Sequence, residues 1–448
     1  MEPLDRWLDD EYRYAATAML RSVSPVDIVK QRPGFGQTVR AVRGAIVASP
    51  VLGSYDPDPD YFFHWYRDSA VVLDALRLLA ADGSIGEEAQ THFADFLHFN
   101  HALQALDGRA LISEPAWRAR VAPDFLRFLR DDAELAEVRG EAVGAETRVN
   151  ADGTLDISKW ARPQHDGPPL RALALLRWLR SQPVAEEQHQ MASALIRADL
   201  AFARRRWRQL SFDIWEEESG LHYYTLRVSA AALGEGAEWL DSCGAGSEAQ
   251  GCRAERDAIL AALDGYWLPA EGYYRSRVLA GGARSAKELD IAVILAAIHS
   301  YRDDRPAQEP ALHGVDDSRM QATLAHLEAL FDAAYPINRD RVPGNRPAMG
   351  RYAGDVYFSG GAYYFSTLGA AEFCFRAARG AADSQAWIER GDGFLATVRS
   401  FTPPGGELSE QFDQRSGAQT SARHLAWSYA ALISCMAARR DALRGDPR

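Results

Sequence analysis

Residues 383–399, DSQAWIERGDGFLATVR, carry the pattern that decides the fold class. Asp383 is the kind of residue that caps the first turn of a helix. The apolar side chains that follow recur at three- to four-residue spacing and share one helical face: Trp387, Phe394, Leu395 and Val398. The segment is therefore predicted to form an amphipathic helix.

The same periodicity recurs along the whole chain. Leu170, Leu173, Leu176 and Leu179 repeat it in another segment, and sustained strand-like alternation is almost absent. We expect helices at roughly 4–22, 67–82, 86–105, 119–138, 167–182, 185–207, 224–240, 248–264, 286–301, 316–334, 361–379, 384–399 and 420–440. About twelve or thirteen helices predict an all-α fold.

The 448 residues are long enough for one large domain or for three ordinary ones. No stretch has the composition of an interdomain tether, so we expect residues 1–448 to form a single domain. A fixed-period repeat is not visible, which disfavours a solenoid and leaves an irregular bundle or a closed double ring of helices. Long loops at 46–63, 139–166, 265–283 and 335–360 are the places where function is expected.

Charge and cysteine content exclude several classes of function. The formal net charge of −12 disfavours nucleic acid and anionic membranes as partners. The four cysteines lack the short paired spacing of a zinc site, so neither a metal nor another cofactor is expected. Cys243 and Cys252 bracket a Gly/Ser-rich loop, and free thiols are favoured there over a disulfide.

The chain termini give an expectation about location. Residues 1–20 lack the basic and apolar regions of a signal peptide, and no apolar run approaches the roughly 18 residues of a membrane span. Nothing after the last predicted helix, near residue 440, could form a further binding module. We therefore expect a cytoplasmic protein without such a module. We also expect it to be a monomer.

Residues 212–224, FDIWEEESGLHYY, contain the first candidate for chemistry. Glu216 and Glu217 follow Trp215, and a carboxyl held against an aromatic ring loses hydration until it can carry a proton near neutral pH. The alternative is an ordinary solvated acidic face. Far along the chain, Glu410 lies among polar and aromatic neighbours after a Gly/Pro-rich loop. Two carboxylates flanking one bond are the minimal machinery for glycoside hydrolysis.

Two further clusters suit the recognition of a sugar. In residues 60–69, DYFFHWYRDS, Arg67 and Asp68 offer donors and acceptors for hydroxyl groups, with Tyr61 and Trp65 as platforms. A helix-capping Asp68 beside a surface salt bridge is the alternative.

The second cluster is WARPQHDGP at residues 160–168, where Trp160, Arg162 and Gln164 alternate. In an extended segment these three side chains share one side and can face a common ligand. A third mixture of glycine and aromatic residues spans 350–364.

Five segments together resemble the glucoamylases of glycoside hydrolase family 15, and they occur in the order of that family. They are YFFHWYRDSA, WARPQHDGPPLRA, FDIWEEESG, GRYAGDVYFSGGAYYF and LSEQFDQRSGAQTSARHLAWSYAAL, between residues 61 and 432. The resemblance implies an (α/α)6 barrel. It also implies an inverting exo-hydrolase that releases β-D-glucose from the non-reducing ends of α-1,4-glucans.

The resemblance implies a role for each matching residue. Glu216 corresponds to the general acid and Glu410 to the general base. The expected substrate contacts are Tyr61, Trp65, Arg67, Asp68, Trp160, Arg162, Gln164, Trp215, Glu217, Tyr357, Tyr363 and Gln411. One further basic contact is ambiguous between Arg284 and Lys287, and Arg284 is preferred.

The sequence also departs from the family pattern, at Ala161, His165, Tyr363 and His424. The change at Tyr363 leaves the preferred linkage and chain length open. One alternative is a related enzyme that prefers α-1,6 linkages. Another is a non-catalytic toroid that binds glucans, and the presence of both Glu216 and Glu410 argues against it.

Overall fold

The computed structural model describes residues 4–54, 57–302 and 313–445. Within them the helices are α1 (Leu4–Leu20), α2 (Tyr66–Ala81), α3 (Glu88–Leu103), α4 (Gly108–Ser113), α5 (Asp132–Glu137), α6 (Gly167–Ser181), α7 (Glu186–Arg206), α8 (Tyr223–Ser242), α9 (Gly246–Asp264), α10 (Ala292–His299), α11 (Ser318–Ala334), α12 (Tyr364–Ala378), α13 (Ser384–Phe401) and α14 (Ala426–Arg444). The prediction of an all-α fold is confirmed.

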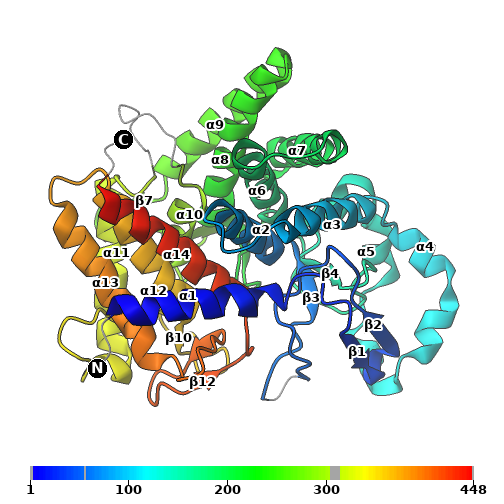
Figure 1. Ribbon diagram of the computed structural model, residues 1–448. Helices are drawn as coiled ribbons and strands as arrows, with labels where there is room; N and C mark the ends of the chain where they lie inside the picture. The colour runs from blue at the N-terminus through cyan, green and yellow to red at the C-terminus, as the bar shows by residue number, and fades with distance from the viewer. Residues whose placement is uncertain (1–3, 55–56, 303–312, 446–448) are drawn as a thin grey trace.

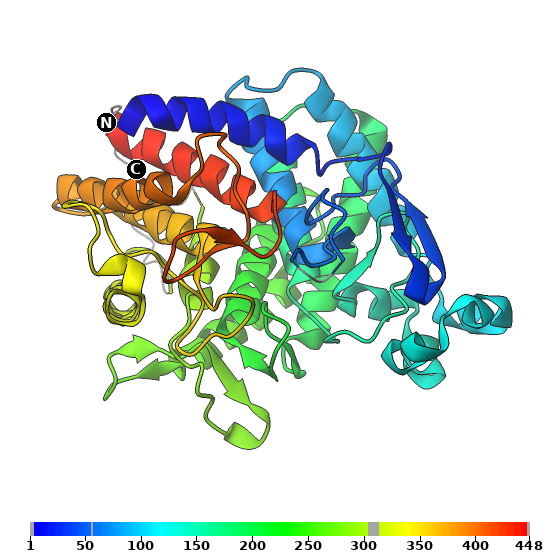
Figure 2. The same ribbon diagram turned by 90° about the horizontal axis from the view of Figure 1, so that it is seen from below.

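Six helices close into an inner ring. Each helix packs against the next in the order α2, α6, α8, α10, α12 and α14, and α14 packs against α2. The helices α1, α3, α7, α9, α11 and α13 pack outside that ring (Figure 1). This is the double ring of an (α/α)6 barrel. Seen from below, α1 lies alongside α14, so the two ends of the described chain meet on one side of the barrel (Figure 2).

Burial explains why the inner helices have apolar residues on all sides. Every residue of α12 except Arg376 is buried. A helix enclosed by neighbours on every side cannot keep a polar face. The ring of Phe93 on α3 stacks on that of Trp178 on α6, with centroids 4.5 Å apart.

Short strands precede three of the inner helices and attach distant loops to one end of the barrel. β3 (Phe63–Trp65) pairs with β4 (Arg148–Asn150) immediately before α2. Before α8, β6 (Ser219–His222) pairs with β5 (Ser211–Phe212) and β9 (Arg277–Leu279). Before α12, β10 (Ala362–Tyr363) pairs with β11 (Gln411–Phe412), which also pairs with β12 (Gln419–Thr420).

The remaining strands lie away from these three helix starts. β1 (Val29–Arg32) pairs with β2 (Gln37–Arg40), and β7 (Trp267–Leu268) pairs with β8 (Tyr273–Tyr274). Both pairs are antiparallel hairpins that belong to the connecting loops.

One predicted helix is wrong. Residues 119–138 do not form a continuous helix but contain 3-10 turns at Pro115–Arg120 and Pro123–Phe128, followed by the short α5. Pro123 causes the break, because proline lacks the amide hydrogen and disfavours helical geometry in the residue before it. Ala122 is accordingly extended, with ψ at 140°.

Two other predicted helices begin later than expected. The helix expected at 286–301 is α10, which starts at Ala292, where a side-chain oxygen of Asp290 accepts a hydrogen bond from the Ala292 amide. The helix expected at 420–440 is α14, which starts at Ala426 because residues before it form β12 and a turn. Among the residues that the structure describes, no helix is both long and apolar enough to cross a bilayer. Cys243 is exposed and Cys252 is buried, and both thiols are free.

Candidate active site

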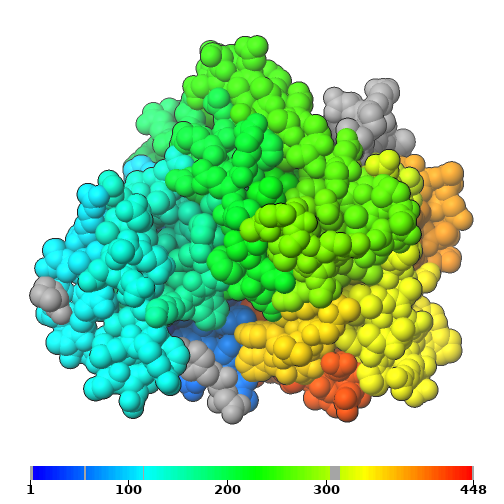
Figure 3. Space-filling model, turned by 180° about the vertical axis from the view of Figure 1, so that it is seen from behind, coloured from blue at the N-terminus to red at the C-terminus, as the bar shows by residue number. Residues whose placement is uncertain are grey.

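A cavity of about 240 Å³ lies at the end of the barrel where the short strands attach. We call it the reaction pocket. Its lining comes from loops far apart in the sequence: Ala48, Tyr61, Trp65, Arg67, Asp68, Trp160, Ile214, Trp215, Glu216, Glu217, Arg351, Tyr357, Phe365, Glu410, Leu425 and Trp427. The blue, cyan, green and yellow parts of the chain that carry most of these loops meet on the face shown in Figure 3. The structure therefore brings Glu216 and Glu410 to one cavity.

Glu216 stands on a tight turn between β5 and β6. Its backbone has φ of 65°, in the left-handed region that few non-glycine residues adopt. The side chain of Asp213 holds this turn by accepting the amides of Glu217 at 2.7 Å and Glu218 at 3.1 Å. A conformation of this kind persists only where its surroundings enforce it.

Three donors surround the carboxyl group of Glu216. Trp65 Nε1 donates to Oε1 at 2.8 Å, and Arg67 Nη2 donates to the same oxygen at 3.0 Å. Trp160 Nε1 donates to Oε2. The two tryptophans and the arginine come from two predicted clusters, and together they fix the direction in which this carboxyl points.

Glu410 precedes β11 and is 9% exposed. Ser421 Oγ donates a hydrogen bond to Oε2, and the Tyr61 hydroxyl lies 3.3 Å from Oε1. Burial raises the pKa of Glu410 to about 7, and the hydrogen bond from Ser421 opposes that rise. The Tyr61 hydroxyl also lies 2.8 Å from the Tyr357 hydroxyl, so a polar cluster surrounds this carboxyl.

Arg67 and Asp68 lie in the first turn of α2, each 5% exposed. Arg67 contacts Asp166 Oδ2 at 3.3 Å as well as Glu216, and its Nε lies 3.4 Å from Asp68 Oδ2. Burial raises the pKa of Asp68 to about 6. The alternative of a surface salt bridge is therefore wrong, because both side chains are buried at the pocket.

Glu217 shows which basic residue reaches the site. Lys287 Nζ lies 2.6 Å from Glu217 Oε2, and Arg351 Nη2 lies 3.0 Å from Oε1. Lys287 does not itself line the pocket, but it contacts the pocket residue Glu217. Arg284, the preferred prediction, has a largely exposed guanidinium that pairs with Glu271 and Glu288 instead. The two candidates are only three positions apart, and the sequence alone could not tell which one turns inward.

Four other predicted substrate contacts lie behind the wall of the pocket. Arg162 binds Glu146 at 2.8 Å and Asp156 at 3.0 Å, so its charge is already paired. Gln164 Nε2 donates to the backbone oxygen of Asp213 at 2.7 Å and thereby supports the Glu216 turn. Neither residue lines the pocket, and Gln164 acts on it through the backbone of Asp213.

The other two of these residues pair with each other. Gln411 Nε2 donates to the Tyr363 hydroxyl at 2.8 Å. The Tyr363 hydroxyl lies 3.3 Å from Asp355 Oδ2, and Asp355 in turn holds Arg351. Tyr363 and Gln411 therefore position Arg351. This arginine was not among the predicted contacts, although it lies in the cluster of glycine and aromatic residues at 350–364.

Aromatic rings close the pocket at its inner end. Phe365 and Trp427 stack with centroids 4.5 Å apart, and Trp215 stacks on both. Trp215 Nε1 donates to Asp290 Oδ2 at 2.9 Å, and burial raises the pKa of Asp290 to about 6. Phe365, Trp427 and Asp290 were not predicted, because each sits in or beside a helix whose pattern indicates only core.

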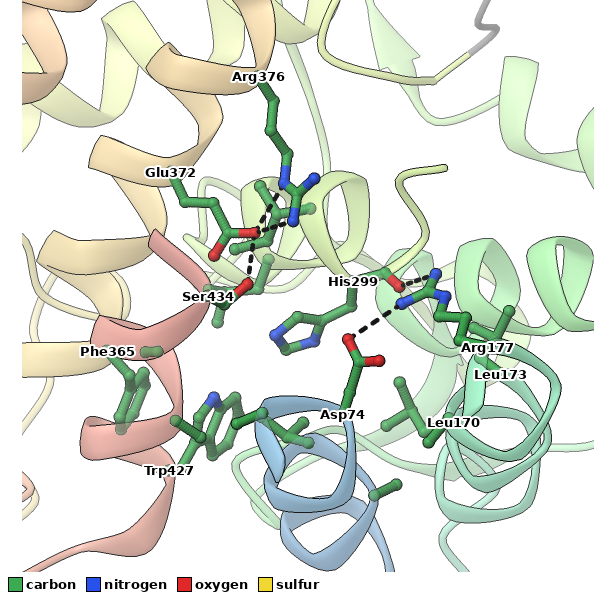
Figure 4. A pocket seen from close by; sticks show the side chains of 18 residues that line it. Asp74, Leu170, Leu173, Arg177, His299, Phe365, Glu372, Arg376, Trp427 and Ser434 are labelled. Atoms are coloured by element: carbon green, nitrogen blue, oxygen red, sulfur yellow. Dashed lines mark hydrogen bonds and ion pairs between the residues drawn. The ribbon is translucent and has the colours of Figure 1, made fainter. Parts of the chain in front are cut away.

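A smaller cavity of about 40 Å³ lies along the barrel axis and shares Phe365 and Trp427 with the reaction pocket (Figure 4). Its charged side chains point toward one another from the inner helices, with Arg177 3.5 Å from Asp74 and Arg376 bound to Glu372. Because these charged side chains form ion pairs with one another, we interpret the cavity as a polar part of the barrel core. The stacked rings of Phe365 and Trp427 thus form the floor of the reaction pocket.

Comparison with known proteins identifies relatives over almost the whole chain. A sequence model described as "Glycosyl hydrolases family 15" matches residues 32–107, 141–389 and 382–437. A glucoamylase of Neurospora crassa is 30% identical over 89% of this chain, which spans 64% of that relative's length. A probable glucoamylase of Schizosaccharomyces pombe is 26% identical to this chain, and the match covers 99% of this chain and 93% of the relative's length. The solved structure of Hormoconis resinae glucoamylase superposes with a TM-score of 0.76 at 27% identity, covering 99% of this chain and 76% of that one.

Proposed function

The chain belongs to glycosyl hydrolase family 15, and from that premise we propose that it is an inverting exo-hydrolase that releases β-D-glucose from the non-reducing ends of α-1,4-glucans. The observation that supports this most directly is the pair of carboxyls, Glu216 and Glu410, in one cavity with a closed floor. Neither a lone carboxyl nor an open groove would suit the removal of single terminal sugars.

The floor explains exo action. The terminal glucose enters until it meets the rings of Phe365 and Trp427, and its hydroxyls meet Arg67 and Asp68. A guanidinium and a carboxylate beside each other supply donors and acceptors at fixed positions, which orients the sugar for reaction. Because the pocket ends there, only a chain end can reach the carboxyls.

The two carboxyls then act in turn. Glu216 gives its proton to the departing glycosidic oxygen, while ionised Glu410 takes a proton from the attacking water. The water approaches from the face opposite the leaving group, so the configuration at the anomeric carbon inverts. Trp65, Arg67 and Trp160 hold the Glu216 carboxyl in one direction, and Ser421 does the same for Glu410.

Incubation with maltotriose and isomaltose, followed by NMR of the first sugar released, tests the proposal. We expect glucose from maltotriose whose initial anomer is β, with slower release from isomaltose. An initial α anomer would show a retaining mechanism. Preference for isomaltose would favour an α-1,6-acting enzyme, and no hydrolysis of either sugar would favour a non-catalytic toroid.

A further inference from the structure

A cavity of about 310 Å³ lies outside the inner ring, between the inner helix α6 and the outer helices α3 and α7 (Figure 1). We call it the lateral cavity. A 3-10 turn at Gly140–Ala145 contributes much of its remaining wall. The described residues that line it include none of those that line the reaction pocket. Its volume lies in the range of small-molecule sites, roughly 300–1,000 Å³.

Two ion pairs balance the charged groups of the lateral cavity. In the interior, Arg171 pairs with Asp199 at 2.6 Å, and both side chains are buried. Asn100 Oδ1 accepts a further N–H of Arg171 at 2.9 Å. Nearer to solvent, Glu141 pairs with the exposed Arg205. Because each cation lies beside an anion, the lining gives no net attraction for an ion and suits a neutral ligand.

The rest of the lining combines apolar surface with a free hydroxyl. The buried side chains of Phe202, Leu103 and Pro168 supply the apolar surface. The hydroxyl of Tyr66 is buried and has no hydrogen-bond partner in the described part of the chain. A buried hydroxyl without a partner is unfavourable, and a ligand that offers one relieves that cost. The lateral cavity therefore matches a neutral molecule with an apolar face and hydroxyl groups at its edge.

The starts of α2 and α6 separate the lateral cavity from the reaction pocket. Tyr66 lines the lateral cavity, while the next residue, Arg67, lines the reaction pocket and pairs with Asp166 at 3.3 Å. Gly167 packs so closely on Tyr66 that a methyl group in its place would lie 2.5 Å from the Tyr66 Cβ. A sugar chain held in the reaction pocket cannot pass through this packing, so the lateral cavity must take a separate molecule.

We propose that the lateral cavity is a second binding site, separate from the reaction pocket, for a free neutral monosaccharide. A pyranose ring presents a flat apolar face to the ring of Phe202 and places hydroxyls at its edge for the buried polar groups. The choice of glucose as the sugar rests on the function proposed above, which makes glucose the product of the reaction pocket. The site itself follows from the lining and does not depend on that function.

Ala198→Phe tests the site by filling it. Ala198 is an exposed residue of α7 that lines the lateral cavity, so a ring added there occupies the mouth. Ala194→Phe is the matched control, because Ala194 is exposed one turn earlier on α7 and lines neither the lateral cavity nor the reaction pocket. Phe202→Leu removes the aromatic ring but keeps an apolar side chain. Binding of glucose to the full chain is measured by calorimetric titration, with the reaction pocket filled by a hydrolysis-resistant maltose analogue.

We expect the unaltered protein to bind one glucose per chain beside the analogue. Ala198→Phe should raise the Kd for this glucose at least about tenfold and Phe202→Leu about threefold, while Ala194→Phe changes it less than about twofold. Glucuronate and glucosamine carry a charge on the same ring and should bind more weakly to the unaltered protein than glucose does.

Three results would overturn the lateral site: no glucose bound beside the analogue, equal Kd in Ala198→Phe and Ala194→Phe, or equal binding of glucose and the two charged sugars. The last comparison uses the unaltered protein, so it does not depend on the folding of a variant. If the analogue displaces no glucose at all, while Ala198→Phe still weakens glucose binding, the result counts against the proposed function and supports the lateral site.

Discussion

Single residues hold the two carboxyls of the reaction pocket in different surroundings. Glu216 meets three donors, one of them the guanidinium of Arg67, on a turn with positive φ. Glu410 is enclosed and meets the hydroxyls of Ser421 and Tyr61. The two identical side chains are therefore held by different partners, and burial raises the pKa of Glu410.

Substitution of either carboxyl should abolish most turnover. Glu216→Gln and Glu410→Gln each keep the shape of the side chain but remove a positioned proton-transfer group, so we expect kcat on maltotriose to fall at least about a hundredfold. Glu271→Gln, at a half-buried partner of Arg284 outside the pocket, is the control. Near-normal kcat in either pocket variant would refute the assignment.

The pH profile should respond to Ser421. A general base acts only when ionised, so activity rises as pH increases through the pKa of Glu410, about 7. The Ser421 hydrogen bond lowers that pKa, because it favours the ionised carboxyl. Ser421→Ala should therefore move the acidic limb of kcat/KM to higher pH. Ser416→Ala, exposed in the same loop, is expected to leave the limb in place.

At the scale of residues, the sequence predicted site residues correctly where they belong to a recognisable motif. It did not where the folded shape of a loop determines which side chain reaches the site. Glu216, Glu217 and Glu410 all line the pocket. Lys287 rather than Arg284 contacts Glu217, because which of two side chains three positions apart turns inward depends on the fold of their loop.

The Ser421→Ala experiment has a contradicting outcome. If the acidic limb of its kcat/KM profile moves to lower pH, or does not move, the role given to the Ser421 hydroxyl is wrong.

At the scale of elements, α1 carries a buried carboxyl that makes stability depend on pH. Glu11 is 4% exposed, and its Oε1 has no hydrogen-bond partner among the described residues. Burial raises the pKa of Glu11 to about 8. The folded protein thus binds a proton between pH 4.5 and 8 that the unfolded chain has released, so this group's contribution to stability falls as pH rises through that range.

Glu11→Gln should remove this penalty. We expect Tm to rise by about 2–4 °C at pH 8.5 and to stay nearly unchanged at pH 4.5. Asp9→Asn, on the exposed face of the same helix, is the control and should show no such dependence. Equal shifts of Tm at both pH values would show that the ionisation of Glu11 is not the cause. Thermal unfolding followed by calorimetry provides the measurement.

The small sheet of β5, β6 and β9 depends on Arg277. This side chain is 1% exposed and contacts Asp213 at 2.8 Å, Glu218 at 3.0 Å and Asp290. It therefore joins the turn that carries Glu216 to the start of α10. Removal of one cation would leave several carboxylates without compensation in a buried setting.

Arg277→Met should accordingly destabilise the fold by about 3–5 kcal/mol and lower kcat, because the Asp213 turn loses its support. Arg275→Met is the matched control, since Arg275 lies two positions away and donates to the carbonyl oxygen of Gly265. Denaturant unfolding and initial rates give the two readouts. A loss below about 1 kcal/mol would mean that the three carboxylates are not held by this cation.

Element boundaries show the limit of periodicity as a guide. The pattern at 384–399 predicted α13 almost to its ends, because Asp383 accepts the Ala386 amide at 3.0 Å as expected of a cap. The same reasoning failed at 119–138, where apolar spacing concealed the effect of Pro123. The short strands were missed altogether, because strands of two to four residues are too short to show alternation.

At the scale of the whole molecule, closure of the inner ring determines where the reaction pocket forms. The number of predicted helices did not distinguish a closed double ring from an irregular bundle, because about twelve helices suit both. The resemblance to family 15 favoured the double ring. Contacts between α14 and α2 join the last inner helix to the first. Loops from both halves of the chain then reach one end of the barrel, which places Tyr61 beside Glu410 across 349 positions of sequence.

Because the inner ring is closed, we expect a ligand bound in the reaction pocket to stabilise the entire barrel. A hydrolysis-resistant maltose analogue at 100 times its Kd should add about 2.7 kcal/mol. With an unfolding entropy of roughly 2.1 cal/mol/K per residue over 448 residues, this corresponds to an increase in Tm of about 3 °C. Asp68→Asn, which loses a pocket carboxylate, should show a much smaller shift. Because the pocket draws on both halves of the ring, a single calorimetric transition should move as a whole. Two transitions of which only one responds to the analogue would show that the ring unfolds in separate parts and that residues 1–448 are not one cooperative domain.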